Sequence, residues 1–252
     1  MVISVPVFMY HHVLPEDDFL AISVKNFERQ MKFLAEKGYH TLSADEFLAF
    51  KKGEYKPPKK SILLTFDDGW RDLYFYAYPI MKKYGLKGTI FLVTSWVERA
   101  SIKKAEFFPY FHKECKALVR KAPEKVVLNW EEVEKMQDVF DFHSHTHTHF
   151  EDKICIKEEF ELSREILKER LGIESRHLCW PRGYYDEKLF SLGKACGYEI
   201  FYTTERGTNI PDGRLERIKR IAVKPGLLWF KKALFIYSHK AIANVYLKFR
   251  KN

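Results

Sequence analysis

The chain has 252 residues, of which 46% are apolar and 31% are charged, and its formal net charge is +9. This balance excludes an intrinsically disordered chain, and the length suffices for one substantial α/β domain. The positive charge favours an anionic partner, such as nucleic acid, an anionic membrane surface or a phosphorylated substrate, but it also fits a basic protein without one.

Cysteine spacing and the first residues predict an intracellular protein. The four cysteines form no C-x-x-C pair and no disulfide framework, so we expect reduced thiols. No basic leader precedes an apolar segment and a cleavage site, and no apolar run is long enough for a membrane span. We therefore expect a cytoplasmic location, with peripheral contact to the inner face of the membrane as a further option.

Strands and helices are predicted to alternate along the chain. Short apolar runs predict strands over 6–10, 39–42, 61–66, 88–93, 139–142, 176–180, 198–203 and 218–223. Amphipathic spacing, capping signals and terminal glycines predict helices over 26–37, 43–52, 72–84, 129–137, 156–171 and 186–196. This alternation favours a parallel barrel.

One segment, 95–125, has a looser pattern. Aromatic residues at 107, 108, 110 and 111 lie beside lysines and a histidine. Interleaved aromatic and basic residues can bind single-stranded nucleic acid, but the pattern does not repeat. A packed insertion that shapes a substrate groove is the favoured interpretation.

Two adjacent carboxylates, Asp67 and Asp68, follow the apolar run that begins at Ser61. The carboxyl ends of parallel strands are where α/β folds place their chemistry. Two acids at such a position repel each other and lose solvation unless a positive group holds at least one of them, and a divalent metal is a natural candidate. The competing interpretation is that Asp68 caps the helix that follows.

A histidine-rich run from His143 to His149 follows another short apolar segment. Histidines at i and i+4 face the same way on a helical turn, and histidine with carboxylate is a common ligand set for zinc and other first-row metals. A solvated loop is the alternative. Together with the two carboxylates, this run predicts a metal site.

Three motifs in order resemble those of the polysaccharide deacetylases, the NodB-like superfamily also called carbohydrate esterase family 4. They are Thr65 to Gly69, Ser144 to His149, and Trp180 to Asp186, and the resemblance extends from about residue 6 to residue 223. It implies a distorted (β/α) barrel of seven strands, which we place in residues 1–225.

The resemblance also implies a metal-dependent hydrolase that removes N-acetyl groups from an N-acetylated sugar or polysaccharide. Asp68, His145 and His149 match the metal ligands, with zinc expected and cobalt, nickel, manganese or iron as alternatives. Asp67 matches the general base that activates water. The chain would thus bind an N-acetylated carbohydrate, and no nucleic acid is expected.

The general acid is assigned through a permuted motif order. Most family members carry this histidine near the C-terminus, whereas those acting on poly-N-acetylglucosamine carry it in an early Tyr-His pattern. Met9-Tyr10-His11 is similar to the permuted form, so His11 is the expected acid and His239 is its rival.

The third motif departs from the family pattern. It often begins with an arginine that pairs with the base, but Trp180 stands at that position, so Arg182 or Arg220 would have to supply the positive charge. The backbone N–H of Arg182 is the expected oxyanion donor. Trp180 and Tyr184 are expected either to line the sugar site or to pack in the core.

The segment 226–252 is predicted as a basic amphipathic C-terminal helix, because apolar residues alternate with lysines and an arginine. It would either pack across the barrel or lie on an anionic membrane. The alternatives to N-deacetylation are removal of a formyl or other acyl group from a lipid-linked sugar, and a non-catalytic carbohydrate-binding or assembly protein that kept the barrel.

Overall fold

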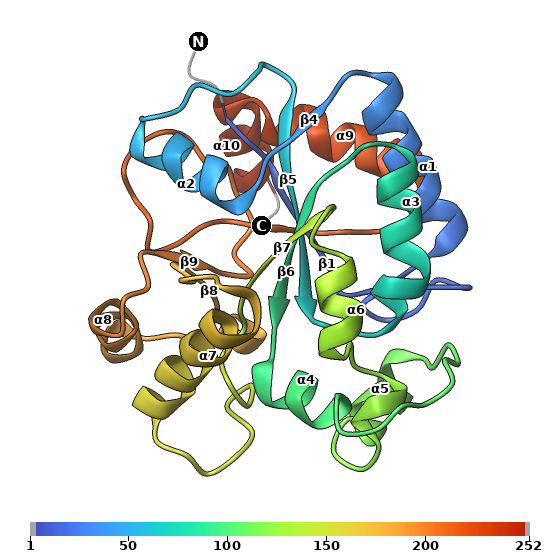
Figure 1. Ribbon diagram of the computed structural model, residues 1–252. Coiled ribbons are helices and arrows are strands. Elements are labelled where there is room, and N and C mark those ends of the chain that lie inside the picture. The colour runs from blue at the N-terminus through green and yellow to red at the C-terminus, as the bar shows by residue number, and fades with distance from the viewer. Residues whose placement is uncertain (1–3, 250–252) are drawn as a thin grey trace.

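A curled sheet of parallel strands forms the centre of the computed structural model, which describes residues 4–249 (Figure 1). Its strands follow the order β10-β1-β5-β6-β7-β8-β9, and β4 pairs with β5 beside this path. The strand bounds are β1 Val7–Tyr10, β4 His40–Thr41, β5 Ser61–Asp68, β6 Gly88–Leu92, β7 Phe140–Ser144, β8 His177–Cys179, β9 Ile200–Tyr202 and β10 Ile221–Ala222.

The two ends of the sheet are joined through the chain before β10. Ile218 forms a parallel bridge with Tyr202 of β9, and β10 then pairs with β1. Seven strands along a curled parallel path confirm the predicted distorted (β/α) barrel. Central strands β1, β5 and β6 are buried along their whole length, as their unbroken apolar runs predict.

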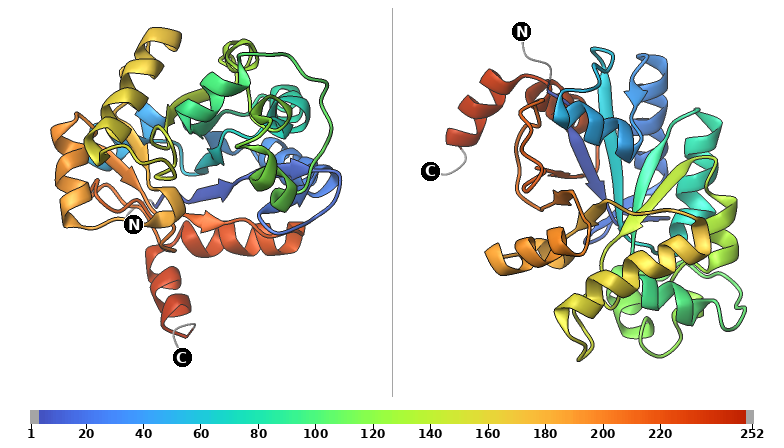
Figure 2. Two further views of the ribbon diagram at one scale, coloured as in Figure 1. Left: turned by 90° about the horizontal axis from the view of Figure 1, so that it is seen from below. Right: turned by 60° about the vertical axis from the view of Figure 1, so that its left-hand side comes forward.

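Helices cover the outside of the sheet (Figure 2). Their bounds are α1 Val24–Glu36, α2 Ala44–Lys52, α3 Tyr78–Lys83, α4 Thr94–Ala100, α5 His112–Leu118, α6 Trp130–Lys135, α7 Ile156–Leu171, α8 Glu187–Ala195, α9 Leu227–Tyr237 and α10 Lys240–Lys248. A small parallel pair, β2 His12–Leu14 and β3 Ala21–Ser23, lies outside the main sheet. The predicted insertion 95–125 contains most of α4, all of α5 and connecting loops.

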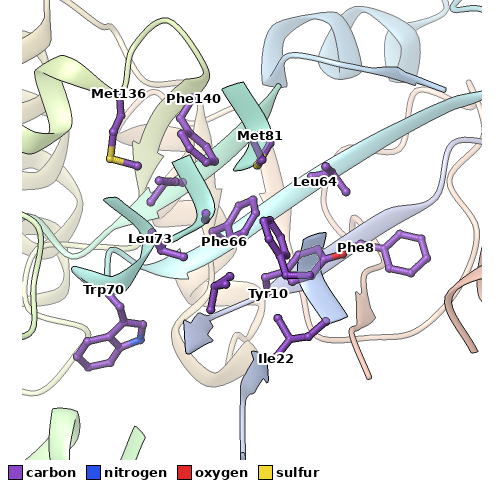
Figure 3. Close-up of a cluster of buried hydrophobic side chains, with 14 of the residues drawn as sticks. Phe8, Tyr10, Ile22, Leu64, Phe66, Trp70, Leu73, Met81, Met136 and Phe140 are labelled. Carbon is purple, nitrogen blue, oxygen red and sulfur yellow. The ribbon is translucent and has the colours of Figure 1, made fainter. Parts of the chain in front are cut away.

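The main core lies between the sheet and the outer helices (Figure 3). Phe8 of β1, Phe66 of β5 and Phe140 of β7 are buried there beside Met81 of α3. Alternate residues of β5 point the other way, so Leu63 belongs to a second buried cluster. The core therefore fixes which side chains of β5 face the barrel interior.

The C-terminal segment forms two helices, which corrects the prediction of one helix over 226–252. His239 is extended, with φ −124° and ψ 101°, and its ring lies 2.7 Å from the carbonyl oxygen of Phe235 through Nδ1. That carbonyl would accept the backbone N–H of residue 239 in a continuous helix, so the side chain replaces the backbone donor. Residues 1–3 and 250–252 of the predicted domains lie outside the described residues, and the boundary at residue 225 remains a prediction.

The first of these helices, α9, packs on the core, while α10 projects from the body of the molecule (Figure 2). Phe230 of α9 is fully buried, with its ring 4.9 Å from that of Phe8. Across residues 4–249, no helix combines the length and the apolar composition needed to cross a bilayer.

Candidate active site

Asp68 and two histidines converge at the carboxyl end of β5. Oδ1 of Asp68 lies 3.3 Å from Nε2 of His145 and 3.5 Å from Nε2 of His149. All three side chains are buried, and their donor atoms lie within 4.8 Å of one another. The second oxygen of Asp68 accepts a hydrogen bond from the indole N–H of Trp70 at 2.9 Å. One oxygen and two imidazole nitrogens thus face a common point.

The histidine run reaches this point through a loop. The prediction that the i, i+4 histidines lie on a helical turn is therefore wrong. Thr146 and His149 are left-handed, with φ of 65° and 62°. The N–H of His145 donates to the carbonyl of Leu92 at 2.8 Å, which anchors the loop to β6. The N–H of His149 donates to Oγ1 of Thr146 at 3.1 Å, which turns the chain back on itself.

Outer contacts orient both histidines. Nδ1 of His145 donates to the carbonyl of Cys179 at 2.8 Å, which leaves Nε2 unprotonated and aimed at Asp68 in the neutral ring. Nδ1 of His149 lies 3.5 Å from the carboxylate of Glu151, within ion-pair distance but without a hydrogen bond among the described residues. Partners of this kind normally fix the tautomer of a metal-binding histidine, so the arrangement fits a metal ion.

Glu151 is a site residue that the sequence reasoning missed. Lys116 and Arg182 place their cations 3.3 and 3.1 Å from Oε1 of Glu151, the same oxygen that His149 approaches. The contact with His149 leads the causes that lower the pKa of Glu151 to about 2, so the group is ionised at neutral pH. The sequence feature that could have identified it is an acidic residue two positions after His149, a candidate metal ligand.

Asp67 is held by Arg220 inside the barrel. The guanidinium donates from Nη1 to Oδ1 at 2.6 Å and from Nη2 to Oδ2 at 2.8 Å, and both side chains are buried. Burial alone would raise the pKa of Asp67, but Arg220 and then His11 outweigh it and hold the pKa below its usual value. Of the two arginines left open by the sequence, Arg220 is therefore the one that contacts Asp67.

His11 lies beside the same carboxylate, with Nε2 3.9 Å from Oδ2 of Asp67. Burial lowers the pKa of His11, although the nearby carboxylates of Asp67 and Asp68 oppose the shift. The rival, His239, caps α10, contacts the carbonyl of Phe235 and does not line the cavity that contains His11 and Asp67.

A cavity of about 310 Å³ opens over these groups and is lined by Met9, His11, Leu20, Asp67, Asp68, His112, Lys116, His145, His149, Trp180, Arg182 and Thr204. Trp180 is fully buried, and among the described residues its indole N–H has no hydrogen-bond partner. Arg182 is left-handed, with φ 58°. Tyr184 is 64% exposed and is not among the lining residues. A cavity of about 530 Å³ beside α8 is larger, but it contains none of the predicted site residues.

A second metal-capable group shares His145 with the first. Asp67, His145 and Cys179 also bring three donor atoms within 4.8 Å. Both oxygens of Asp67, however, already accept hydrogen bonds from Arg220, and burial raises the pKa of the Cys179 thiol, which disfavours the thiolate that binds metals. The group at Asp68 is therefore the better metal site.

The remaining histidines of the run do not join the cluster. Nδ1 of His147 lies 3.0 Å from Oγ1 of Thr94. His143 is buried deeper in the barrel, where it bonds to Ser175 and packs against His177 with ring centroids 4.2 Å apart. Among the described residues, the histidines that pair with Asp68 are His145 and His149, and neither His143 nor His147 joins them.

A family model described as polysaccharide deacetylase matches residues 54–201. A candidate polysaccharide deacetylase of Bacillus subtilis is 28% identical over 242 residues, covering 94% of this chain and 77% of that protein. A poly-β-1,6-N-acetyl-D-glucosamine N-deacetylase of Staphylococcus epidermidis is 25% identical over 244 residues, covering 85% and 77%.

Solved structures agree in fold. A Streptococcus pyogenes deacetylase in complex with acetate superposes with a TM-score of 0.77 at 24% identity, covering 95% of this chain and 100% of that one. A candidate polysaccharide deacetylase of Bacillus anthracis gives a TM-score of 0.72 at 26% identity, covering 92% and 69%. The chain belongs to the polysaccharide deacetylase family, and this membership makes it a hydrolase that acts on amide C–N bonds.

Proposed function

We propose that this chain removes N-acetyl groups from a polysaccharide of N-acetylglucosamine, with one divalent metal held by Asp68, His145 and His149. The observation that carries the proposal is the convergence of these three side chains beside a second carboxylate, Asp67, in one cavity. The named substrate of the Staphylococcus relative supports the choice of polysaccharide.

Zinc is the metal we propose. Two neutral imidazoles and one carboxylate are a common set for a catalytic zinc ion, and cobalt, nickel, manganese or iron would accept the same ligands. A metal of this kind supplies Lewis acidity, which polarises an amide carbonyl and lowers the pKa of bound water.

Asp67 and His11 are the proton-transfer groups of the proposal. Asp67, kept ionised by Arg220, takes a proton from the attacking water. His11, on the same cavity wall, donates a proton to the nitrogen of the leaving amine. We assign the backbone N–H of Arg182 to the developing oxyanion, because the left-handed turn at this residue lines the cavity.

Sugar contacts are proposed at two aromatic residues. Trp180 lines the inner cavity, although its ring also packs in the core against Phe201, with centroids 5.4 Å apart. Tyr184 would contact a longer chain outside the cavity, because most of its side chain is exposed.

We also propose that the protein is cytoplasmic and that α10 contacts an anionic membrane surface. Support for the membrane contact comes from exposed Ile242 and Val245 of this helix and from exposed Phe249 directly after it, beside Lys240 and Lys248.

The test measures bound metal and acetate release from N-acetylglucosamine oligomers for the wild type, Asp68→Ala and Asp67→Asn. Asp68→Ala should lose both metal and activity, because it removes the shared carboxylate ligand. Asp67→Asn should keep the metal but lose about 10²- to 10⁴-fold in rate, because it removes the base. Asp138→Ala, a change at an exposed carboxylate on the surface, is the control and should match the wild type.

A folded wild type that takes up no metal would refute the assignment. Bound metal without acetate release would instead direct the search to formyl or other acyl groups on lipid-linked sugars. A non-catalytic carbohydrate-binding protein is indicated if oligomers bind and no acyl group is released.

A further inference from the structure

A chain of buried polar side chains lies behind one wall of the cavity. His12 is fully buried, and its Nδ1 lies 2.7 Å from Oδ2 of Asp72. The other oxygen of Asp72 accepts the backbone N–H of Val13, also at 2.7 Å. Nε2 of His12 lies 3.1 Å from Nδ1 of His112, the first residue of α5. None of these groups has a part in the reaction proposed above.

When both rings are neutral, the order of hydrogen bonds from Asp72 through His12 to His112 fixes their tautomers. A carboxylate can only accept, so Nδ1 of His12 carries the proton that faces Asp72. Nε2 of His12 is then an acceptor, and Nδ1 of His112 must donate to it. Nε2 of His112 is left as a lone-pair acceptor.

This free acceptor belongs to the active-site wall. His112 lines the same cavity as Asp67 and Asp68, and α5 lies at the end of the molecule toward which β5 and β6 point (Figure 1). Among the described residues, Nε2 of His112 has no hydrogen-bond partner. It is also absent from both metal-capable groups, so it is not a fourth ligand of the Asp68 cluster.

The wall around His112 is partly aromatic. The ring of His12 stacks on Trp70 at 4.7 Å, and Trp70 in turn donates to Asp68. On the outer side, Phe19 is 71% exposed and makes an edge contact with His112 at 5.7 Å. An acceptor fixed next to an exposed aromatic ring offers a polar contact and an apolar contact to the same small molecule.

We propose that His112 binds the sugar substrate by accepting a hydrogen bond from a sugar hydroxyl at Nε2, and that Asp72 and His12 are positioning residues that orient it. This inference rests on the proposed function, since it assumes that a sugar enters this cavity. It assigns the wall formed by α5 to recognition of the sugar beside the scissile amide. A site built to accept a substrate hydroxyl discriminates against substrates that lack one.

The test compares an N-acetylglucosamine oligomer with p-nitrophenyl acetate, an ester without a sugar, for the wild type, His112→Ala, His112→Gln and Lys113→Ala. The ratio of the two kcat/KM values should fall about tenfold in His112→Ala, the usual size of one lost hydrogen bond. His112→Gln restores an acceptor near the same place and should recover part of the ratio. Lys113→Ala, an exposed neighbour on α5 that does not line the cavity, should keep the wild-type ratio.

Binding of the oligomer to the metal-free protein gives a readout that does not depend on turnover. The affinity should fall in His112→Ala, and nitrogen NMR of the wild type should show His112 protonated at Nδ1 and not at Nε2. Unchanged affinity, or equal losses on both substrates with no recovery in His112→Gln, would overturn the inference. If the wild type binds the oligomer and releases no acetate, the proposed deacetylation fails, whereas weaker binding by His112→Ala would still support the role of His112.

Discussion

A single buried side chain, His177, should make the free energy of unfolding depend on pH. It is fully buried at the start of β8, with Nε2 3.1 Å from Oδ1 of Asp45 and Nδ1 3.1 Å from the hydroxyl of Tyr202. Burial lowers the pKa of His177 from 6.5, although Asp45 opposes the shift. The folded protein therefore keeps this ring neutral at a pH where the unfolded chain takes up a proton.

The stability that depends on a neutral His177 is fully present above pH 6.5 and is lost as the pH falls. His177→Gln should lower the free energy of unfolding at pH 7.5, because its hydrogen bonds are disturbed. Between pH 7.5 and 5 it should lose stability less steeply than the wild type, by up to about 1.4 kcal/mol per pH unit. Urea unfolding at several pH values measures this slope, with the exposed His40→Gln as control. Equal slopes in wild type and His177→Gln would contradict the prediction.

Sequence patterns predicted the residues that meet at Asp68 but not the backbone that brings them together. The apolar run before Asp67 indicated a buried strand end, and that part was correct. The left-handed residues Thr146 and His149 carry no recognisable signal, since glycine and asparagine are the usual markers of that conformation. Arg220 could not be chosen over Arg182 from sequence, because it reaches Asp67 from 153 positions along the chain.

At the scale of elements, strand positions were predicted more closely than helix continuity. The helix expected over 72–84 is a π-helix at Leu73–Ala77 followed by α3. Pro79 lacks a backbone N–H and its ring clashes with the carbonyl four residues earlier in a regular α-helix, so the wider turn accommodates it. Single-sequence propensities predict that a helix exists but do not show how it adapts to an internal proline.

Two residues of α9 differ sharply in burial and should therefore differ in their contribution to stability. Phe230 is fully buried against Phe8, whereas Leu228 is 82% exposed. Phe230→Ala should cost about 3–5 kcal/mol of unfolding free energy, because it leaves a cavity in the core. Leu228→Ala is the matched control on the same helix and should change stability by less than about 0.5 kcal/mol. Urea unfolding distinguishes them, and similar losses in both variants would show that α9 is not anchored through Phe230.

At the scale of the whole molecule, α10 and the residue after it expose apolar side chains beside lysines. Ile242, Val245 and Phe249 are 38%, 56% and 79% exposed, and their spacing places them on one face of the helix. We expect binding to vesicles that contain phosphatidylglycerol, weakening as salt is added, and little binding to neutral vesicles. Replacing Val245 and Phe249 together by serine should reduce sedimentation with the vesicles. The same change at exposed Phe108 should not, and equal binding by all variants would refute the membrane contact.

The contact between Phe8 and Phe230 also has a consequence for biosynthesis. At a synthesis rate of roughly 5–20 residues per second, α9 follows the first strand out of the ribosome about 10–45 seconds later. During that interval the outer face of β1 lacks its covering helix, and the edge that pairs with β10 is open. The nascent chain therefore carries an apolar strand that can pair with β5 on one edge but stays open on the other until β10 and α9 have been synthesised. Stalling before α9 should produce a species that chaperones recognise.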